Sequence, residues 1–177
     1  MKVLQLTPLA SARVTHSQMT PGARFTGSVH ARVGTDSRAA LGASRVTLEA
    51  LVPRGGRADY GLLGFAFEPA PAPTLDVEVR YSEGNGAAWP ESLAHDVDDV
   101  RLGLPLEYAG PVLSAATSFS TNRFPPGKLV VVEAGHGAVG SSAEVFRRLT
   151  LATLSLMPGR AIAEEELISL LRGLLVE

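Results

Sequence analysis

The chain has 177 residues, enough for one domain with its own hydrophobic core, and it contains no cysteine. The lack of cysteine excludes thiol catalysis and cysteine zinc sites and disfavours a disulfide-built secreted module. No apolar run is long enough for a signal-sequence core or a membrane span, so we expect a soluble, cytoplasmic protein that does not bind membranes.

Charge is distributed unevenly, although the net charge is only −2. Residues 1–60 carry eight basic residues against three carboxylates, a net charge of +5, and the remainder of the chain is therefore −7. Such asymmetry can mark a nucleic-acid-binding face or can be an ordinary solvated surface. The second interpretation is favoured because neither a lysine-rich cluster nor interleaved aromatic residues accompany the arginines.

The front of the chain has the two-residue periodicity of β-strands. Residues 27–33, 44–52, 60–68 and 75–81 alternate between apolar and polar positions, and "LDVEVRY" shows the pattern of a sheet with one wet face. The nearly continuous apolar run "GKLVVVEAG" predicts a strand covered on both faces at 129–133. The sequence therefore predicts one sheet built from the strands near 46–52, 60–68, 75–81 and 129–133.

Helical periodicity dominates the second half. Two prolines close together predict a tight turn over 105–108 and a helix that begins at Pro111 with Gly110 as its cap. Further helices are predicted over 142–157 and 164–175. The last one has an apolar stripe that either closes its own core or joins a second copy in a homo-oligomer.

The predicted core combines the apolar positions of these elements. Its members are Leu48, Leu63, Phe65, Phe67, Val77, Val79, Val112, Ala116, Val130, Val132, Val145, Phe146 and Leu149.

Residues 82–103 are the most irregular stretch and contain "HDVDD". His95 and the three aspartates could supply metal ligands, but the stretch has neither a calcium-loop pattern nor a second histidine at helical spacing. We therefore expect an exposed acidic turn and no metal site.

The stretch "GHGAVGSSAEVF" is the best candidate for special chemistry. Ser141 and Glu144 fit a capping box, in which serine and glutamate satisfy amides of the first helical turn. A nucleoside-triphosphate loop is excluded because the required lysine is missing, and no G-x-S-x-G elbow is present. The sequence thus predicts a protein that is not an enzyme and holds no cofactor.

Three stretches in order resemble domain IV of elongation factor G, the ribosomal translocase. "GGRADYGLLGFAFEP" is similar to its G-G-R-G-Q-Y-G-h-V-x-h-x-h-x-P segment, where h is apolar, and "GLPLEYAGPV" is similar to G-[VI]-[IL]-P-x-E-Y-[IV]-P-A-V. "VVVEAGHGAVGSSAEVFRRL" is similar to V-x-h-x-D-G-x-x-H-x-V-D-S-S-x-x-A-F. Matching positions are Gly55, Gly56, Arg57, Tyr60, Gly61, Pro69, Pro105, Glu107, Tyr108, Val112, Val139, Ser141, Ser142 and Phe146.

The resemblance covers residues 44–157 and implies an α+β fold. It implies a two-layer sandwich in which a four-stranded sheet carries two helices on one face, with a left-handed βαβ crossover. The resemblance places the loops at 53–59 and 134–140 at a tip that contacts RNA. Candidate RNA- or anion-binding residues are then Arg54, Gly55, Gly56, Arg57, His136, Gly137, Ser141 and Ser142. Residues 1–43 would be a β-rich extension packed on this domain, and 158–177 an added helix.

The chain also departs from the family pattern. Gly137 stands where the family has its tip histidine, Gly140 replaces the aspartate of V-D-S-S, and the GTPase is absent. Two functions remain open: a stand-alone, translation-related module that binds ribosomes or structured RNA, and a structural or protein-interaction domain. A third, more distant alternative comes from "GAVGSSA", which resembles the phosphate loop of the GHMP small-molecule kinases.

Overall fold

The computed structural model describes residues 2–37, 41–84, 86–121, 123–158 and 162–177 and shows an α+β protein. Its elements are β1 (Lys2–Gln5), β2 (Ser11–Thr15), β3 (Gly27–Gly34), β4 (Ser44–Arg54), β5 (Arg57–Pro69), β6 (Thr74–Tyr81), β7 (Val100–Leu102), α1 (Leu106–Ser120), β8 (Gly127–Gly137), α2 (Ala143–Leu156) and α3 (Glu164–Leu175). The strands form one mixed eight-stranded open sheet. Its order is β1-β2-β4-β5-β8-β6-β3, and β7 pairs with the end of β8.

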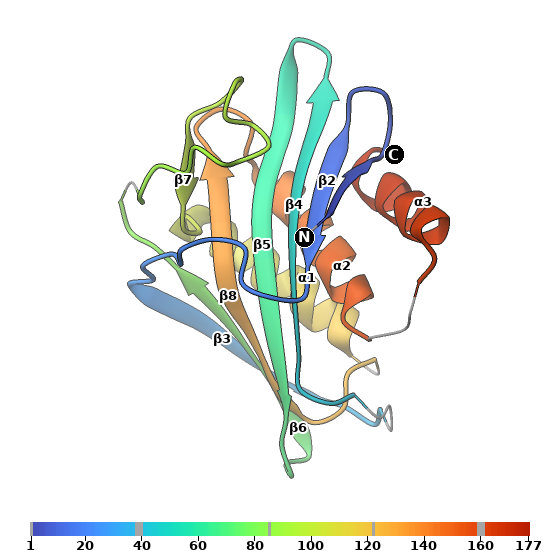
Figure 1. The fold of residues 1–177 in the computed structure, drawn as a ribbon. Helices are drawn as coiled ribbons and strands as arrows, with labels where there is room; N and C mark the ends of the chain where they lie inside the picture. The colour runs from blue at the N-terminus through green and yellow to red at the C-terminus, as the bar shows by residue number, and fades with distance from the viewer. Residues whose placement is uncertain (1, 38–40, 85, 122, 159–161) are drawn as a thin grey trace.

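The central strands β4, β5, β8 and β6 correspond to the four predicted ones, and α1 and α2 lie on the same face of the sheet (Figure 1). β6 and β8 are parallel neighbours, and α1 lies between them in sequence, so they form a βαβ unit. The other strand pairs are antiparallel. The prediction of one sheet with both helices on one face is confirmed.

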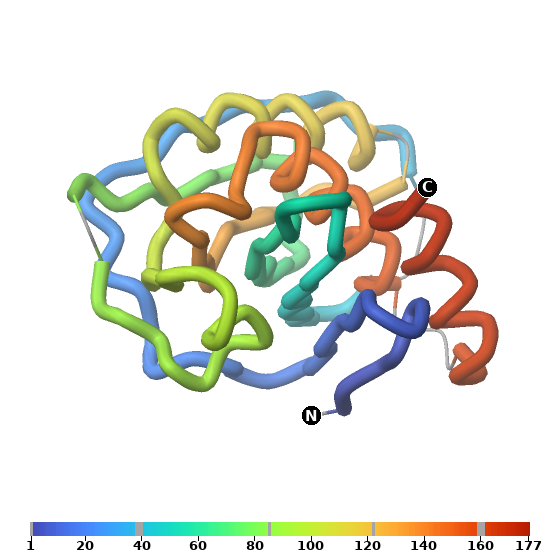
Figure 2. The backbone as a smooth tube through the Cα atoms, turned by 90° about the horizontal axis from the view of Figure 1, so that it is seen from above, coloured from blue at the N-terminus to red at the C-terminus, as the bar shows by residue number. Residues whose placement is uncertain are grey.

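The sheet is wider than the four strands predicted for residues 44–157, because the predicted β-rich N-terminal extension adds strands to it at both edges. β1 and β2 form a hairpin that pairs with β4, and β3 pairs with β6 along its whole length. Between them, residues 16–26 cross the sheet on the side away from the helices (Figure 2). We call this side the open face. The short strands β1 and β2 were missed because neither carries a periodicity long enough to recognise.

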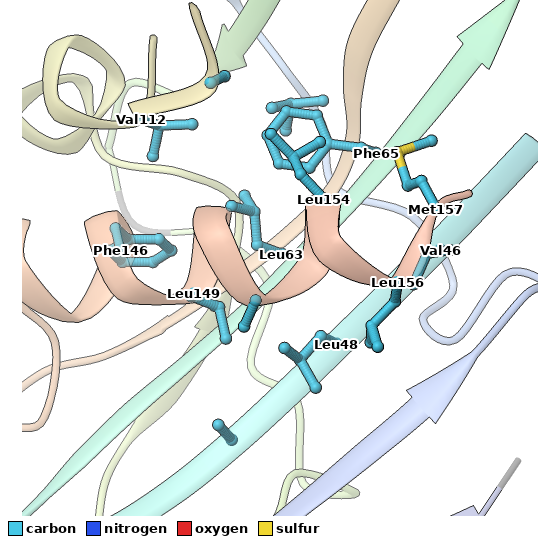
Figure 3. Packing of buried hydrophobic residues seen from close by; sticks show 14 of the residues in the cluster. Val46, Leu48, Leu63, Phe65, Val112, Phe146, Leu149, Leu154, Leu156 and Met157 are labelled. Atoms are coloured by element: carbon cyan, nitrogen blue, oxygen red, sulfur yellow. The ribbon is translucent and has the colours of Figure 1, made fainter. Parts of the chain in front are cut away.

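The main core lies between the sheet and the helices. Phe146 and Leu149 of α2 pack towards Leu63 of β5 and Leu48 of β4, and Leu154 lies beside Phe65 (Figure 3). All six side chains are fully buried. Most predicted core residues are buried as expected, but Val132 and Val145 are only partly buried.

A β-bulge in β8 explains why Val132 is only partly buried. Gly64 pairs with Glu133 and Phe65 with Val131, so Val132 is the extra residue. The bulge reverses the alternation of β8: Val131 faces the helices, whereas Glu133 points to the open face instead of into the apolar core.

Helix α1 corrects the prediction of a turn at 105–108 followed by a helix from Pro111. Pro105 is the N-cap, the helix begins at Leu106, and Pro111 lies inside it. The proline leaves the carbonyl of Glu107 without its helical partner. Because Glu107 is exposed, water can solvate that carbonyl, and the helix tolerates the proline.

Helix α3 has the predicted bounds and packs beside α2. Leu171 and Leu175 are buried in the common core, so part of its apolar stripe is covered by its own chain. Arg172 donates a 2.8 Å hydrogen bond to the carbonyl of Leu6, which ties the helix to the β1–β2 turn. Across the described ranges, no helix is long and apolar enough to cross a membrane.

Candidate functional site

The candidate residues gather at one end of the sheet, which we call the tip: the β4–β5 turn at Gly55 and Gly56 and the loop 138–142 after β8. Gly55 has a φ of 64°, a conformation that favours glycine, so the turn is tight. The predicted loops at 53–59 and 134–140 were too long. β4 and β5 extend to the two glycines, and residues 134–137 belong to β8.

Arg54 is bound within its own chain. Its guanidinium donates to the carbonyls of Val176 at 2.6 Å and Leu175 at 2.9 Å, and its Nε lies 3.2 Å from the carboxylate of Asp59. These carbonyls belong to the C-terminal end of α3, where a cation is favoured by the helix dipole. Arg54 therefore holds α3 against the β4–β5 turn.

Arg57, in contrast, faces solvent. Its side chain is 66 % exposed, and its Nε lies 3.8 Å from the carboxylate of Asp59. Of the two arginines that flank the β4–β5 turn, Arg57 therefore has fewer contacts within the chain than Arg54.

The loop 138–142 is closed by Asp98, which was expected from the sequence only as a potential metal ligand and as part of an exposed acidic turn. Its carboxylate accepts hydrogen bonds from the amides of Val139 at 3.1 Å and Gly140 at 2.7 Å. A Cβ on Gly137 would lie 2.0 Å from that carboxylate, and one on Gly140 would lie 2.4 Å from the carbonyl of Ala58. Gly137 and Gly140 stand where the similar domain of elongation factor G has histidine and aspartate. Because they carry no side chains, they leave room for Asp98 and for β5.

The two serines have separate roles, and the predicted capping box is wrong. Ser142 is the N-cap of α2 and accepts from the amide of Val145 at 3.2 Å. Ser141 instead accepts from the amide of Gly137 and donates to the carbonyl of Tyr60, which joins the loop to β5. Glu144 does not reach back to the cap.

Glu144 pairs with two arginines of its own helix. Hydrogen bonds from Arg147 and Arg148 lower the pKa of its carboxyl group to about 2. The N-terminal half of α2 therefore carries an ion-paired surface cluster in which one carboxylate faces two guanidinium groups, so the cluster keeps a net positive charge.

His136 lies in β8 opposite Arg101, and its Nδ1 lies 3.0 Å from the carbonyl of Gly103. It lines an open hollow of about 600 Å³ beside the start of α1, together with Glu83, Glu107, Tyr108 and other residues of the hollow. The aromatic ring of Tyr108 stacks on Phe146 with ring centroids 5.0 Å apart. The structure therefore places His136 beside carboxylates.

Beside the loop 138–142, the segment 96–99 adds exposed apolar and acidic side chains to the tip. Val139 is 72 % exposed and Val97 is 64 % exposed, and Asp98, next to Val97, binds the amide of Val139. The side chain of Asp96 is 83 % exposed and that of Asp99 is 57 % exposed. The predicted acidic turn is thus present. In the part of the chain that the structure describes, no three potential ligands are grouped so as to hold a metal ion.

Two buried carboxylates on the open face were also missed. Glu133 accepts from the amides and hydroxyl of the crossing segment at Met19 and Thr20 and from the hydroxyl of Thr47, and Arg45 lies 3.1 Å away. Burial raises its pKa, but these hydrogen bonds outweigh the burial and lower it overall. Gly64 leaves space for this network, since a Cβ there would lie 2.4 Å from the Thr47 hydroxyl.

Glu49 accepts from the hydroxyl of Tyr60 at 2.9 Å and the amide of Leu93 at 2.7 Å, and it lies 3.2 Å from Arg13. Burial raises the pKa of its carboxyl group. Arg13 also donates to the carbonyl of Glu91 and stacks over Trp89. These contacts hold segment 87–99, and with it Asp98, on the sheet. Both carboxylates have structural partners and stand outside the tip.

Comparison of the chain with protein-family models, with curated protein sequences and with solved structures found no match.

Proposed function

We propose that this chain is a non-catalytic interaction module built like domain IV of elongation factor G, and that its tip docks on a partner protein. The order of β4, β5, β6, α1, β8 and α2 supports the architecture, because it follows the order of the three similar sequence stretches. In this proposal β4, β5, β8 and β6 are the four-stranded layer of the sandwich. The β6–α1–β8 unit is then its left-handed crossover.

The main support for the proposal is that the carboxylate of Asp98 accepts hydrogen bonds from the amides of Val139 and Gly140. Free amides in this loop could bind a phosphate. In this chain the carboxylate of Asp98 already occupies these amides. A phosphate would have to displace that carboxylate, and the two negative charges would repel each other. Arg54 is engaged too, because it binds the last carbonyls of α3.

The exposed chemistry of the tip defines the partner. Val97 and Val139 offer apolar area, which favours a protein surface, since exposed apolar patches mark interaction sites. The carboxylate of Asp96, one residue from Val97, is 83 % exposed and favours a basic partner through complementary potential, whereas Asp99 is paired with Arg101. We therefore expect a protein that presents an apolar patch with basic side chains beside it.

The test is affinity capture from the source cells with the wild-type chain, with Val97→Ser/Val139→Ser and with Leu9→Ser, changes that remove apolar area without adding charge. Leu9 is a matched control because it is 73 % exposed in the β1–β2 turn, which β4 and β5 separate from the loop after β8. We expect basic proteins to be retained by the wild type and Leu9→Ser but not by the tip variant. Equal capture by all three, with each variant shown to be folded by circular dichroism, contradicts the proposal.

Exposed Arg57 supports a second candidate, namely binding of ribosomes or structured RNA through the β4–β5 turn. Arg57→Ala is the clean test, whereas Arg54→Ala also releases α3. If RNA binds here, wild-type affinity falls as salt rises, and Arg57→Ala reduces the salt slope by about one unit for each phosphate that the guanidinium neutralises. Absence of binding at low salt excludes this candidate.

A further inference from the structure

We infer that the open edge of β3 pairs with the β3 of a second copy, forming a homodimer with a continuous sheet. This inference does not rest on the proposed function, since β3 lies at the sheet edge away from β1 and α3. It concerns the backbone groups on the side of β3 that faces away from β6.

The first argument is that β3 is a long and unprotected edge. It pairs with β6 in unbroken register from Gly27 to Gly34, and no other strand of the described chain pairs with it. Natural sheets protect their edges with short strands, charged side chains (above all lysine), proline or bulges. β3 contains no lysine or proline, its register shows no bulge, and its one charged side chain, Arg32, is paired with Asp76 of the neighbouring strand β6.

The opposite edge of the same sheet shows the contrast. β1 has only four residues, begins with Lys2 and is followed by Pro8 in the next turn. The ammonium group of Lys2 pairs with Glu164 of α3. One edge thus carries protective features that the other lacks.

The side chains of β3 also suit a joined sheet. Val29 and Val33 pack partly against the main core, on the helix side, whereas His30 and Arg32 are exposed on the open face. A second strand laid along this edge would continue both layers: apolar side chains beside the helices and polar ones on the open face.

Self-pairing satisfies this pattern because the sequence of β3 is complementary to itself about Ala31. In an antiparallel pair centred on Ala31, that residue faces its own copy, and Val29 faces Val33. On the open face His30 then lies opposite Arg32, whose charge is paired with Asp76 of β6 within its own copy. A shift by one residue would place apolar side chains opposite polar ones, and a shift by two would place His30 opposite His30 or Arg32 opposite Arg32, so the register centred on Ala31 is favoured.

The absence of cysteine allows a direct test of this register. Opposite Cα atoms of antiparallel strands are about 4.5–5.5 Å apart, which lies within the range for disulfides. We expect Ala31→Cys to form a covalent dimer on mild oxidation. Val29→Cys and Val33→Cys should each form few dimers alone but should cross-link to one another when mixed.

Val3→Cys, on β1, is the matched control, because Val3 is 55 % exposed on the other edge. Light scattering of the unmodified chain across a wide range of concentration should show a monomer–dimer equilibrium. Thermal unfolding of each variant confirms that it is folded. A wild type that stays monomeric throughout, or a Val29→Cys chain that self-links as readily as Ala31→Cys, overturns the inference.

Discussion

The carboxylate of Asp98 accepts a 2.7 Å hydrogen bond from the amide of Gly140, so a residue that precedes β7 closes the loop that follows β8. Asp98→Ala should free the amides of Val139 and Gly140 and lower the free energy of unfolding by about 1–2 kcal/mol. Urea denaturation measures this loss, and hydrogen exchange should show faster exchange at both amides. Asp96→Ala is the control, because its exposed carboxylate makes no contact with the loop amides. Equal effects of the two variants would count against this role of Asp98.

Stability should depend on pH through Glu133. Its pKa is lower in the folded chain than in the unfolded one, so its contribution is complete above the ordinary glutamate pKa and is lost as pH falls through the lowered value. Glu133→Gln should cost about 3 kcal/mol at neutral pH, because it places an amide among donors and removes the charge beside Arg45. Denaturation midpoints between neutral and acidic pH should show this deficit shrinking on acidification. A deficit that is constant with pH would contradict the prediction.

Glu49 and Arg13 should behave as a coupled pair. Glu49→Gln leaves the guanidinium of Arg13 buried without its charge partner, which typically costs about 3–5 kcal/mol. Arg13→Met/Glu49→Gln should recover most of this loss, because the double variant buries no unpaired charge. Chemical denaturation of the wild type, both single variants and the double variant gives the coupling energy. Additive losses would show that the two side chains act independently.

Phe146→Ala should be strongly destabilising. The ring is fully buried between α2 and the sheet and stacks on Tyr108, so its loss opens a cavity at a cost of about 3–5 kcal/mol. Thermal or urea unfolding measures the change. Val145→Ala, one residue away and only partly buried, is the control and should cost clearly less. Similar losses would mean that the core does not depend on this ring.

Removal of the residues after Pro158 tests whether α3 serves its own chain. Leu171 and Leu175 pack in the main core, and Arg54 binds the last carbonyls of the helix. The shortened chain should therefore aggregate or unfold, as judged by light scattering and circular dichroism. A folded, monomeric product would instead show that the helix is dispensable for the fold.

The central fold was predictable because its signals are local. In β4, β5 and β6 apolar and polar residues alternate over long runs, and Pro69 ends one of them. The bounds of α3 also followed from local pattern, since three glutamates mark its first turn. β1 and β2 were expected only as part of a β-rich extension, because strands of four and five residues are too short to show a periodicity.

The tip was less predictable, since its contacts join distant residues. Spacing along the chain gave no sign that Asp98 would meet Gly140, 42 positions later, or that Arg54 would meet the carbonyl of Val176. The bulge at Val132 has no sequence signature either, and it alone directs Glu133 to the open face. The motif resemblance named the candidate residues, but nothing in the sequence identified their partners.

The N-terminal segment supplies strands to both edges of the sheet, and this arrangement determines when during synthesis the fold can be completed. β1, β2 and β3 leave the ribosome before the strands that they join, since β2 needs β4, β3 needs β6, and the segment between them needs Glu133 of β8. Apart from the β1–β2 hairpin, these residues must therefore wait for their partners until β8 has been synthesised. Because such long-range contacts slow folding, the N-terminal strands should be the last to become protease-resistant during synthesis.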